Sequence, residues 1–132
     1  MTPVHLGIFL IAHAIAHAGL TSAPNPSDPE SSPGDFFSHK SRSWLLQRTN
    51  LNSGAVQIIG RILVNVSIVG FILAGLGGLG VPGLSQIWHD LAGITAIISL
   101  VLLILFWHPW LVLGVVINFG LIVFTFLDTW PA

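Results

Sequence analysis

The chain contains no cysteine and very few charged side chains, and each absence excludes a class of protein. Without cysteine there is no disulfide, no thiolate nucleophile and no cysteine-ligated metal. Charged residues make up 7% of the 132 residues, as four basic and five acidic side chains, whereas a soluble domain carries about 25%. With a net charge of −1 and no run of Lys or Arg, the chain also lacks an electrostatic surface for nucleic acid. These absences favour a protein that lipid surrounds.

The sequence motifs of soluble enzymes are also missing. There is no glycine-rich phosphate loop between a strand and a helix, no HExxH and no Gly-x-Ser-x-Gly. The glycine-rich run at residues 75–80 ends a long apolar stretch, which is the wrong context for a nucleotide. We therefore assign no catalytic residue and expect a non-enzymatic protein.

Apolar side chains, by contrast, are abundant: 53% of the residues are hydrophobic and the mean hydropathy is +0.86. Four apolar stretches are close to the 17–25 residues that a bilayer crossing requires. We therefore predict an all-α fold, a single-domain integral membrane four-helix bundle over residues 1–132, located in the cell membrane. The predicted transmembrane helices cover about 4–20, 54–79, 87–107 and 110–127.

The last two apolar stretches are separated only by His108 and Pro109. A single helix through both would be about 60 Å long, twice the hydrocarbon thickness. Pro109 should therefore end one helix and begin the next, giving a tight hairpin. Tryptophans stand at both ends of these two helices, as in a double aromatic belt. They are Trp88, Trp107, Trp110 and Trp130.

The first apolar stretch has small residues near its end, at 16–18 and 21–23, that resemble a signal-peptide cleavage site. However, no Lys or Arg precedes it, histidines interrupt its apolar core, and Pro24 follows the second candidate site. We expect this helix to be retained.

The polar segment at residues 21–53 divides into two parts. Residues 21–34 hold four prolines among polar residues and read as a solvated, irregular loop. Residues 35–52 mix aromatic and basic side chains, which suits either a short amphipathic helix at the headgroup level or an ordinary loop with aromatics packed against the bundle. Three of the four basic residues lie here, and the fourth is Arg61. The positive-inside rule then places this loop and the His108–Pro109 hairpin in the cytoplasm and both termini outside.

Polar residues inside the predicted helices form one constellation. His13 and His17 are about 40° apart around the helix axis and so share a face. Gln57, Arg61 and Asn65 recur every four residues and form a polar stripe on the second helix. Because polar groups within a span normally face the protein interior, we expect this stripe to face His13 and His17. His108 should lie near the same side, with Asn118 deeper.

Four roles are open for this cluster. His13 and His17 could begin a transition-metal site, although Arg61 would repel a cation. A b-type haem could be held by His13 or His17 with His108, with Arg61 pairing with a propionate. The cluster could also conduct protons or small ions. Finally, it could only fix the helix register through hydrogen bonds.

Two other patterns are structural candidates. His5, His89, Asp90 and Asp128 lie close to helix ends on the opposite side, where caps and interfacial polar pairs are common. Small residues spaced by four on the second helix should pack closely on a neighbouring helix, either within this chain, which we favour, or in a second copy or another membrane protein. These small residues are Gly70, Ala74 and Gly78.

Three short motifs resemble those of a group of small bacterial four-helix membrane proteins. They are His13-Ala-Ile-Ala-His17-Ala-Gly19, then Ser41-Arg42-Ser43-Trp44-Leu45-Leu46 after a proline-rich loop, then His108-Pro109-Trp110-Leu111. The resemblance implies four membrane spans, and it implies no activity, substrate or cofactor.

Two functions are therefore expected from the sequence. The first is a non-enzymatic accessory or packing subunit in the membrane, docking through its glycine-lined second helix. The alternative is a redox protein that binds haem or a transition metal through His13, His17 and His108, with Arg61 as anion partner.

Overall fold

The computed structural model describes residues 2–24, 34, 36–38, 40–128 and 130. Within these residues the fold is all-α, as predicted. Four helices form it: α1 (Pro3–Thr21), α2 (Ser53–Gly78), α3 (Trp88–Leu105) and α4 (Val112–Leu127), with 3-10 turns η1 (Lys40–Arg42), η2 (Leu46–Arg48) and η3 (Pro109–Leu111). Each of the four predicted stretches is a helix that is long and apolar enough to cross a membrane.

Local sequence signals explain where the helices begin. At α1, the Thr2 hydroxyl accepts the backbone N–H of His5, the Thr2 N–H points to the His5 ring, and Pro3 takes the first helical position. His5 is therefore a capping residue, as expected for a histidine at a helix end. At α2, the Asn52 side chain accepts the N–H of Ala55 at 2.7 Å.

The hairpin between α3 and α4 forms where proline predicts it. His108 is extended, Pro109 begins η3, and Nδ1 of His108 accepts the backbone N–H of Trp110 at 3.1 Å. α3 ends at Leu105, two residues before the predicted Trp107. The residue before a proline is disfavoured in a helix, so the chain leaves the helical path early.

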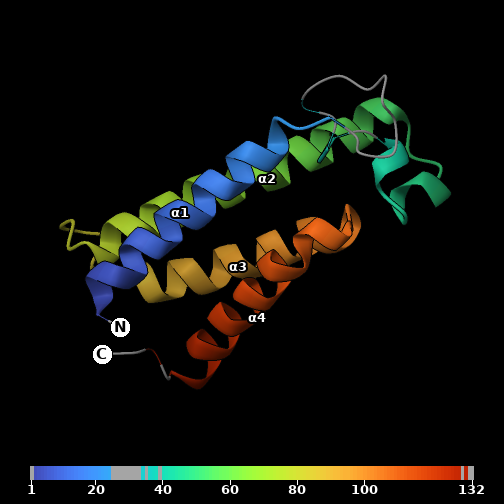
Figure 1. Cartoon of the computed structure of the whole chain (residues 1–132). Coiled ribbons are helices and arrows are strands. Elements are labelled where there is room, and N and C mark those ends of the chain that lie inside the picture. Colours follow the sequence, from blue (N-terminus) through green and yellow to red (C-terminus); the bar gives the residue numbers. More distant parts are fainter. Residues whose placement is uncertain (1, 25–33, 35, 39, 129, 131–132) are drawn as a thin grey trace.

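Consecutive helices pack against one another, whereas α1 and α4 are not a closely packed pair. In Figure 1, α1 and α2 lie alongside each other, α3 follows, and α4 diverges from α1. The start of α1 and the end of α4 lie at one end of the bundle. The first loop and the α3–α4 turn lie at the other.

The small residues of α2 are used inside the chain. Gly70, Ala74 and Gly78 are all buried. A Cβ on Gly78 would lie 3.0 Å from the Cα of Gly7 on α1, and one on Gly70 would overlap the Thr95 side chain on α3. The stripe therefore packs α2 between α1 and α3, which is the intramolecular alternative of the prediction.

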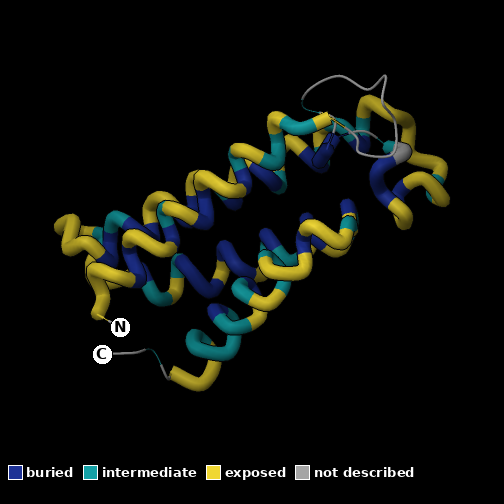
Figure 2. The backbone as a smooth tube through the Cα atoms, in the orientation of Figure 1, coloured by how far each residue is buried: buried dark blue, intermediate teal, exposed yellow. Residues whose placement is uncertain are grey.

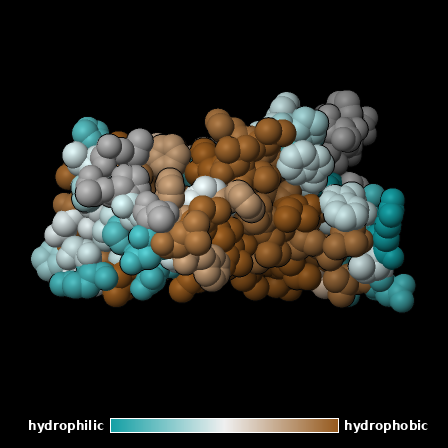
Figure 3. All heavy atoms as spheres, turned by 90° about the horizontal axis from the view of Figure 1, so that it is seen from below, coloured by the Kyte–Doolittle hydropathy of each residue, from teal (hydrophilic) through white to brown (hydrophobic). Residues whose placement is uncertain are grey.

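The outer surface suits a hydrocarbon environment. Buried positions line the inner sides of α1–α3, while much of α4 is exposed (Figure 2). On the face shown in Figure 3, hydrophobic side chains occupy the middle of the molecule and hydrophilic ones gather at both ends. A central apolar band between polar ends is the pattern of a membrane protein.

The first loop differs from the predicted amphipathic helix. Its described residues form η1 and η2 rather than an α-helix, and Phe36, Phe37 and Leu46 are buried while Trp44 and Leu45 are exposed. The alternative, a loop with aromatics packed on the bundle, is therefore the better description. Most of the region predicted to be irregular, 25–33, and residues 35 and 39 lie outside the described residues.

Three consecutive side chains of this loop cap the C-terminal end of α3. Such carbonyls have no partner further along the chain, because the helix ends and Pro109 has no N–H. The donors and acceptors are Arg42 Nη2 with Phe106 O at 2.6 Å, Arg42 Nη1 with Trp107 O at 3.2 Å, Ser43 Oγ with Leu105 O at 2.6 Å, and Trp44 Nε1 with Ile104 O at 2.7 Å. The Arg42 guanidinium also lies 4.4 Å above the Phe36 ring. Burial lowers the pKa of Arg42, and its charge complements the negative end of α3.

Replacing Ser43 with alanine should destabilise the protein. The fully buried Ser43 hydroxyl donates to α3 and accepts the N–H of Leu46 at 3.0 Å, so Ser43→Ala strands two buried groups. We expect a loss of about 1–3 kcal/mol in the free energy of unfolding, measured by denaturant titration in detergent micelles. Ser85→Ala, at an exposed position of the α2–α3 turn, is the matched control. Equal stability of the two variants would contradict the capping role.

Candidate functional site

Four buried polar side chains join three helices at the centre of the bundle. His13 Nε2 lies 3.1 Å from Asn118 Oδ1, and His17 Nε2 lies 2.7 Å from Ser99 Oγ. Asn118 Nδ2 donates to Ser99 Oγ at 2.8 Å, and His17 Nδ1 donates to the carbonyl of His13 at 3.0 Å. We call His13, His17, Ser99 and Asn118 the polar network. It ties α1 to both α3 and α4.

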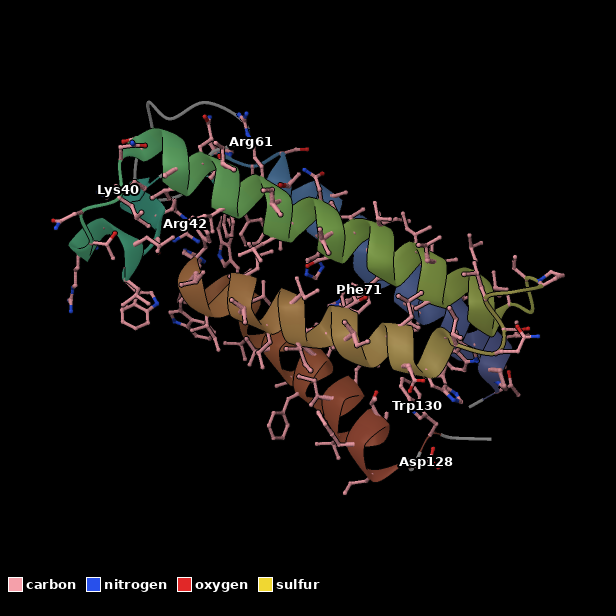
Figure 4. All side chains as sticks on the ribbon, turned by 180° about the vertical axis from the view of Figure 1, so that it is seen from behind. Lys40, Arg42, Arg61, Phe71, Asp128 and Trp130 are labelled. Carbon is pink, nitrogen blue, oxygen red and sulfur yellow. The ribbon has the colours of Figure 1, made fainter. Side chains whose placement is uncertain are left out.

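The remaining helix, α2, contributes an aromatic side chain that contacts both histidines. Phe71 of α2 is fully buried, and its ring centroid lies 4.8 Å from that of His13 and 5.7 Å from that of His17. The two imidazoles are edge to face, with centroids 4.7 Å apart. Phe71 lies within the bundle in Figure 4. In such apolar surroundings an imidazolium would carry a large desolvation cost, which favours the neutral form of both rings.

The polar network borders a groove between α1 and α4, which we call the α1–α4 groove. It contains one cavity of about 290 Å³ and a second of about 220 Å³, which have Phe9 and Ile117 in common. The first cavity includes both histidines in its wall, and the second continues toward the chain ends. Their other lining residues are almost all apolar: Leu6, Ala12, Ala16, Leu20, Leu103, Trp110, Leu111, Leu113, Gly114, Val116, Gly120, Leu121 and Phe124.

The polar stripe of α2 does not make the contact that the sequence predicts. Arg61 and Asn65 are exposed and Gln57 is half-buried, and Asn65 Nδ2 donates to the carbonyl of Arg61 at 2.8 Å. The histidines instead face Ser99 and Asn118. Figure 4 shows Arg61 in the half of α2 nearer the first loop, on the side away from α3.

The rotation of α2 explains this difference. Gly60 is buried against the carbonyl of Phe37, which a Cβ at this position would overlap. Val64 and Phe71 continue the same buried face of α2. Arg61 therefore points to another side. α2 has 26 residues and is about 39 Å long, exceeding the hydrocarbon thickness of about 30 Å. An arginine two turns from its start can thus reach the polar headgroups.

His108 also lies outside the polar network. Its ring packs edge-on against Phe36, with centroids 5.9 Å apart, and against Trp110 at 4.6 Å. Partial burial and, to a smaller extent, the Arg42 guanidinium lower the pKa of His108. Its place as the N-cap of η3 gives it a structural role.

The predicted cofactor ligands gain no support from this arrangement. No group of three or more His, Asp or Glu side chains gathers into a possible metal site within the described part of the chain. The predicted haem pair is His13 or His17 with His108. His13 and His17 are hydrogen-bonded to Asn118 and Ser99, whereas His108 caps η3 and packs against Phe36.

At the opposite end of the bundle, one of the polar residues, His89, is part of an aromatic stack. The His89 ring lies parallel to that of Trp130, with centroids 4.6 Å apart, and contacts Trp88 at 4.0 Å. Asp128 follows α4 in the left-handed conformation, φ 51°. Asp90 is exposed in the first turn of α3, where a negative charge is favourable.

Sequence reasoning missed Ser99, which stands among apolar residues of α3. A signal was present: Thr95 and Ser99 are four apart and both are buried, so they mark the inner face of a helix that is otherwise apolar all round.

Comparisons with family models, with curated proteins and with solved structures give no match for this chain.

Breaking the polar network should cost stability. Asn118→Leu removes two hydrogen bonds, each worth about 0.6–1.7 kcal/mol in a membrane protein. We expect the free energy of unfolding in micelles to fall by about 1–3 kcal/mol. Asn65→Leu is the matched control, since that asparagine is exposed and bonds only to its own helix. A larger loss for Asn65→Leu would restore the α2 stripe as the important polar element.

Proposed function

We propose that this chain is a non-enzymatic integral membrane protein that crosses the bilayer four times and binds a lipid-soluble molecule in the α1–α4 groove. The observation that carries the proposal is the groove itself. It has apolar walls, lies where two helices are not closely packed, and has two buried imidazoles beside it. Ligand pockets typically combine such apolar walls with a few placed polar groups.

The depth of His13 in the membrane restricts which kind of molecule could occupy the groove. His13 is ten residues from the start of α1 and eight from its end, which corresponds to about 15 Å and 12 Å along the axis. In a hydrocarbon layer of about 30 Å, this is close to the midplane. A phospholipid headgroup stays at the interface, so the groove fits a weakly polar molecule that dissolves in the bilayer interior.

An accessory subunit that docks a partner helix in the groove is the competing function. The packing face predicted for it, Gly70, Ala74 and Gly78, is already used between α1 and α3. A transmembrane helix is about 10 Å wide and its backbone N–H groups are satisfied internally. It therefore fits a cavity of about 290 Å³ less well than a single chain-like molecule.

A photoreactive probe tests the binding proposal. Hexadecanol carrying a diazirine on its chain, added to phospholipid vesicles containing the protein, should label α1 and α4 around Phe9 and Ile117, and unlabelled hexadecanol should compete. Ala16→Phe should reduce this labelling several-fold, because it fills the first cavity. Ile15→Phe, 64% exposed on α1 and outside both cavities, should leave it unchanged.

Two results would contradict the proposal. Labelling spread evenly over the lipid-facing positions would show that the groove does not retain the probe. Cross-links from groove residues to a second copy or to another membrane protein, in place of the probe, would favour the accessory function.

Orientation is tested by cysteine labelling, which the cysteine-free sequence makes straightforward. Gln47 and Ser85 are exposed near opposite ends of the bundle. Because the basic residues gather at the Gln47 end, we expect a membrane-impermeant maleimide to label Ser85→Cys in intact cells and Gln47→Cys only after lysis. The reverse pattern would place the first loop outside.

A further inference from the structure

The hydrogen bonds of the polar network can be satisfied with only one arrangement of protons. The carbonyl of His13 can only accept, so Nδ1 of His17 carries its proton. Nε2 of the neutral His17 ring must then accept, and the Ser99 hydroxyl is its donor. Because the Ser99 hydroxyl already donates its one proton to His17, its oxygen accepts from the amide nitrogen of Asn118.

The same reasoning fixes the tautomer of His13. With its nitrogen turned to Ser99, Asn118 presents its oxygen to His13, so Nε2 of His13 is the donor. A flipped Asn118 amide would present a second donor-seeking oxygen to Ser99, whose single proton is already used. His13 is therefore protonated on Nε2, and its lone pair is on Nδ1.

Nδ1 of His13 is the only imidazole nitrogen of the polar network without a hydrogen-bond partner among the described residues. The side chain of His13 is only 7% exposed. Among the described residues, two side-chain atoms are fully enclosed and have no hydrogen-bond partner, Arg42 Nε and Trp130 Nε1. Nδ1 of His13 is not one of them, so this nitrogen is not fully enclosed. His13 lies in the wall of the first cavity, so the α1–α4 groove is the space beside this ring from which a ligand would approach it.

We infer that the molecule bound in the groove donates a hydrogen bond to Nδ1 of His13, and that it is a neutral O–H donor on an apolar body, an alcohol or a phenol. This inference rests on the proposed function, because it names the ligand class of the same groove. A ketone, an ester or an ether presents lone pairs to a lone pair and gains nothing. An ammonium group could donate, but its burial near the bilayer midplane is costly.

Paired ligands test this donor requirement. Competition against the diazirine probe compares hexadecanol, hexadecyl methyl ether and a phenol that carries the same alkyl chain. The alcohol should bind about tenfold more tightly than the ether, the difference that one hydrogen bond of about 1.4 kcal/mol makes. If the phenol exceeds the alcohol the occupant class is phenolic, and if it falls below the ether the occupant is an aliphatic alcohol.

Substitution and spectroscopy assign the effect to His13. In His13→Phe, which keeps an aromatic ring but no acceptor, the preference for alcohol over ether should disappear, while His89→Phe, outside both cavities, should retain it. If His13→Phe does not fold, nitrogen-15 NMR of the histidine-labelled native protein still decides. The alcohol should shift the Nδ1 resonance of His13, and the ether should not.

The outcomes separate this inference from the proposed function. Equal binding of alcohol and ether would overturn the donor requirement and leave groove binding intact. Failure of every ligand to compete with the probe would overturn the proposed function as well. Retention of the alcohol preference in His13→Phe, or an unshifted Nδ1 resonance, would show that His13 is not the acceptor.

Discussion

Hydrocarbon offers no hydrogen-bond partner, and this constraint explains both polar features of the fold. At the end of α3, the loop from Arg42 to Trp44 supplies side-chain donors to carbonyls that the proline turn leaves free. In the middle of the bundle, His13, His17, Ser99 and Asn118 are hydrogen-bonded to one another. In both places residues far apart in the sequence are brought together because each supplies a hydrogen-bond partner that the other lacks. The few polar groups of this chain therefore specify how its apolar helices are arranged.

The helices were predictable because their signals are local. Apolar length fixes each crossing, and Pro109 alone requires the hairpin, since it cannot continue the helix before it. The first loop was predicted only as one of two alternatives, because its shape depends on contacts with a distant part of the chain. Arg42 and Ser43 look like solvated loop residues in the sequence, yet both are buried against α3. A mixture of basic and aromatic residues does not reveal that its partners are backbone carbonyls.

The site was predictable in part for the same reason. Histidines four apart in an apolar helix indicate a shared inner face, and His13 and His17 are indeed buried. Their partners could not be read from the stripe at Gln57, Arg61 and Asn65, because a periodic pattern does not give the rotation of its helix. Close approaches set that rotation: Gly60 against the Phe37 carbonyl and Gly70 against Thr95 turn the stripe away from α1. The histidines of α1 are instead hydrogen-bonded to Ser99 of α3 and Asn118 of α4.

Residue size also explains why α1 and α4 do not pack closely along the α1–α4 groove. Gly7 of α1 meets glycines of α2 at backbone distance, whereas large side chains such as Phe9 and Ile117 stand between α1 and α4. The hydrogen bond between His13 and Asn118 joins these two helices. Acyl chains of the bilayer can fill the apolar part of such a groove at little cost, so its existence alone selects no ligand. They cannot donate to Nδ1 of His13, and a buried acceptor left unpaired costs about 1–3 kcal/mol. A molecule that fills the groove and also carries a hydroxyl recovers that free energy, and this difference distinguishes a bound ligand from the surrounding lipid.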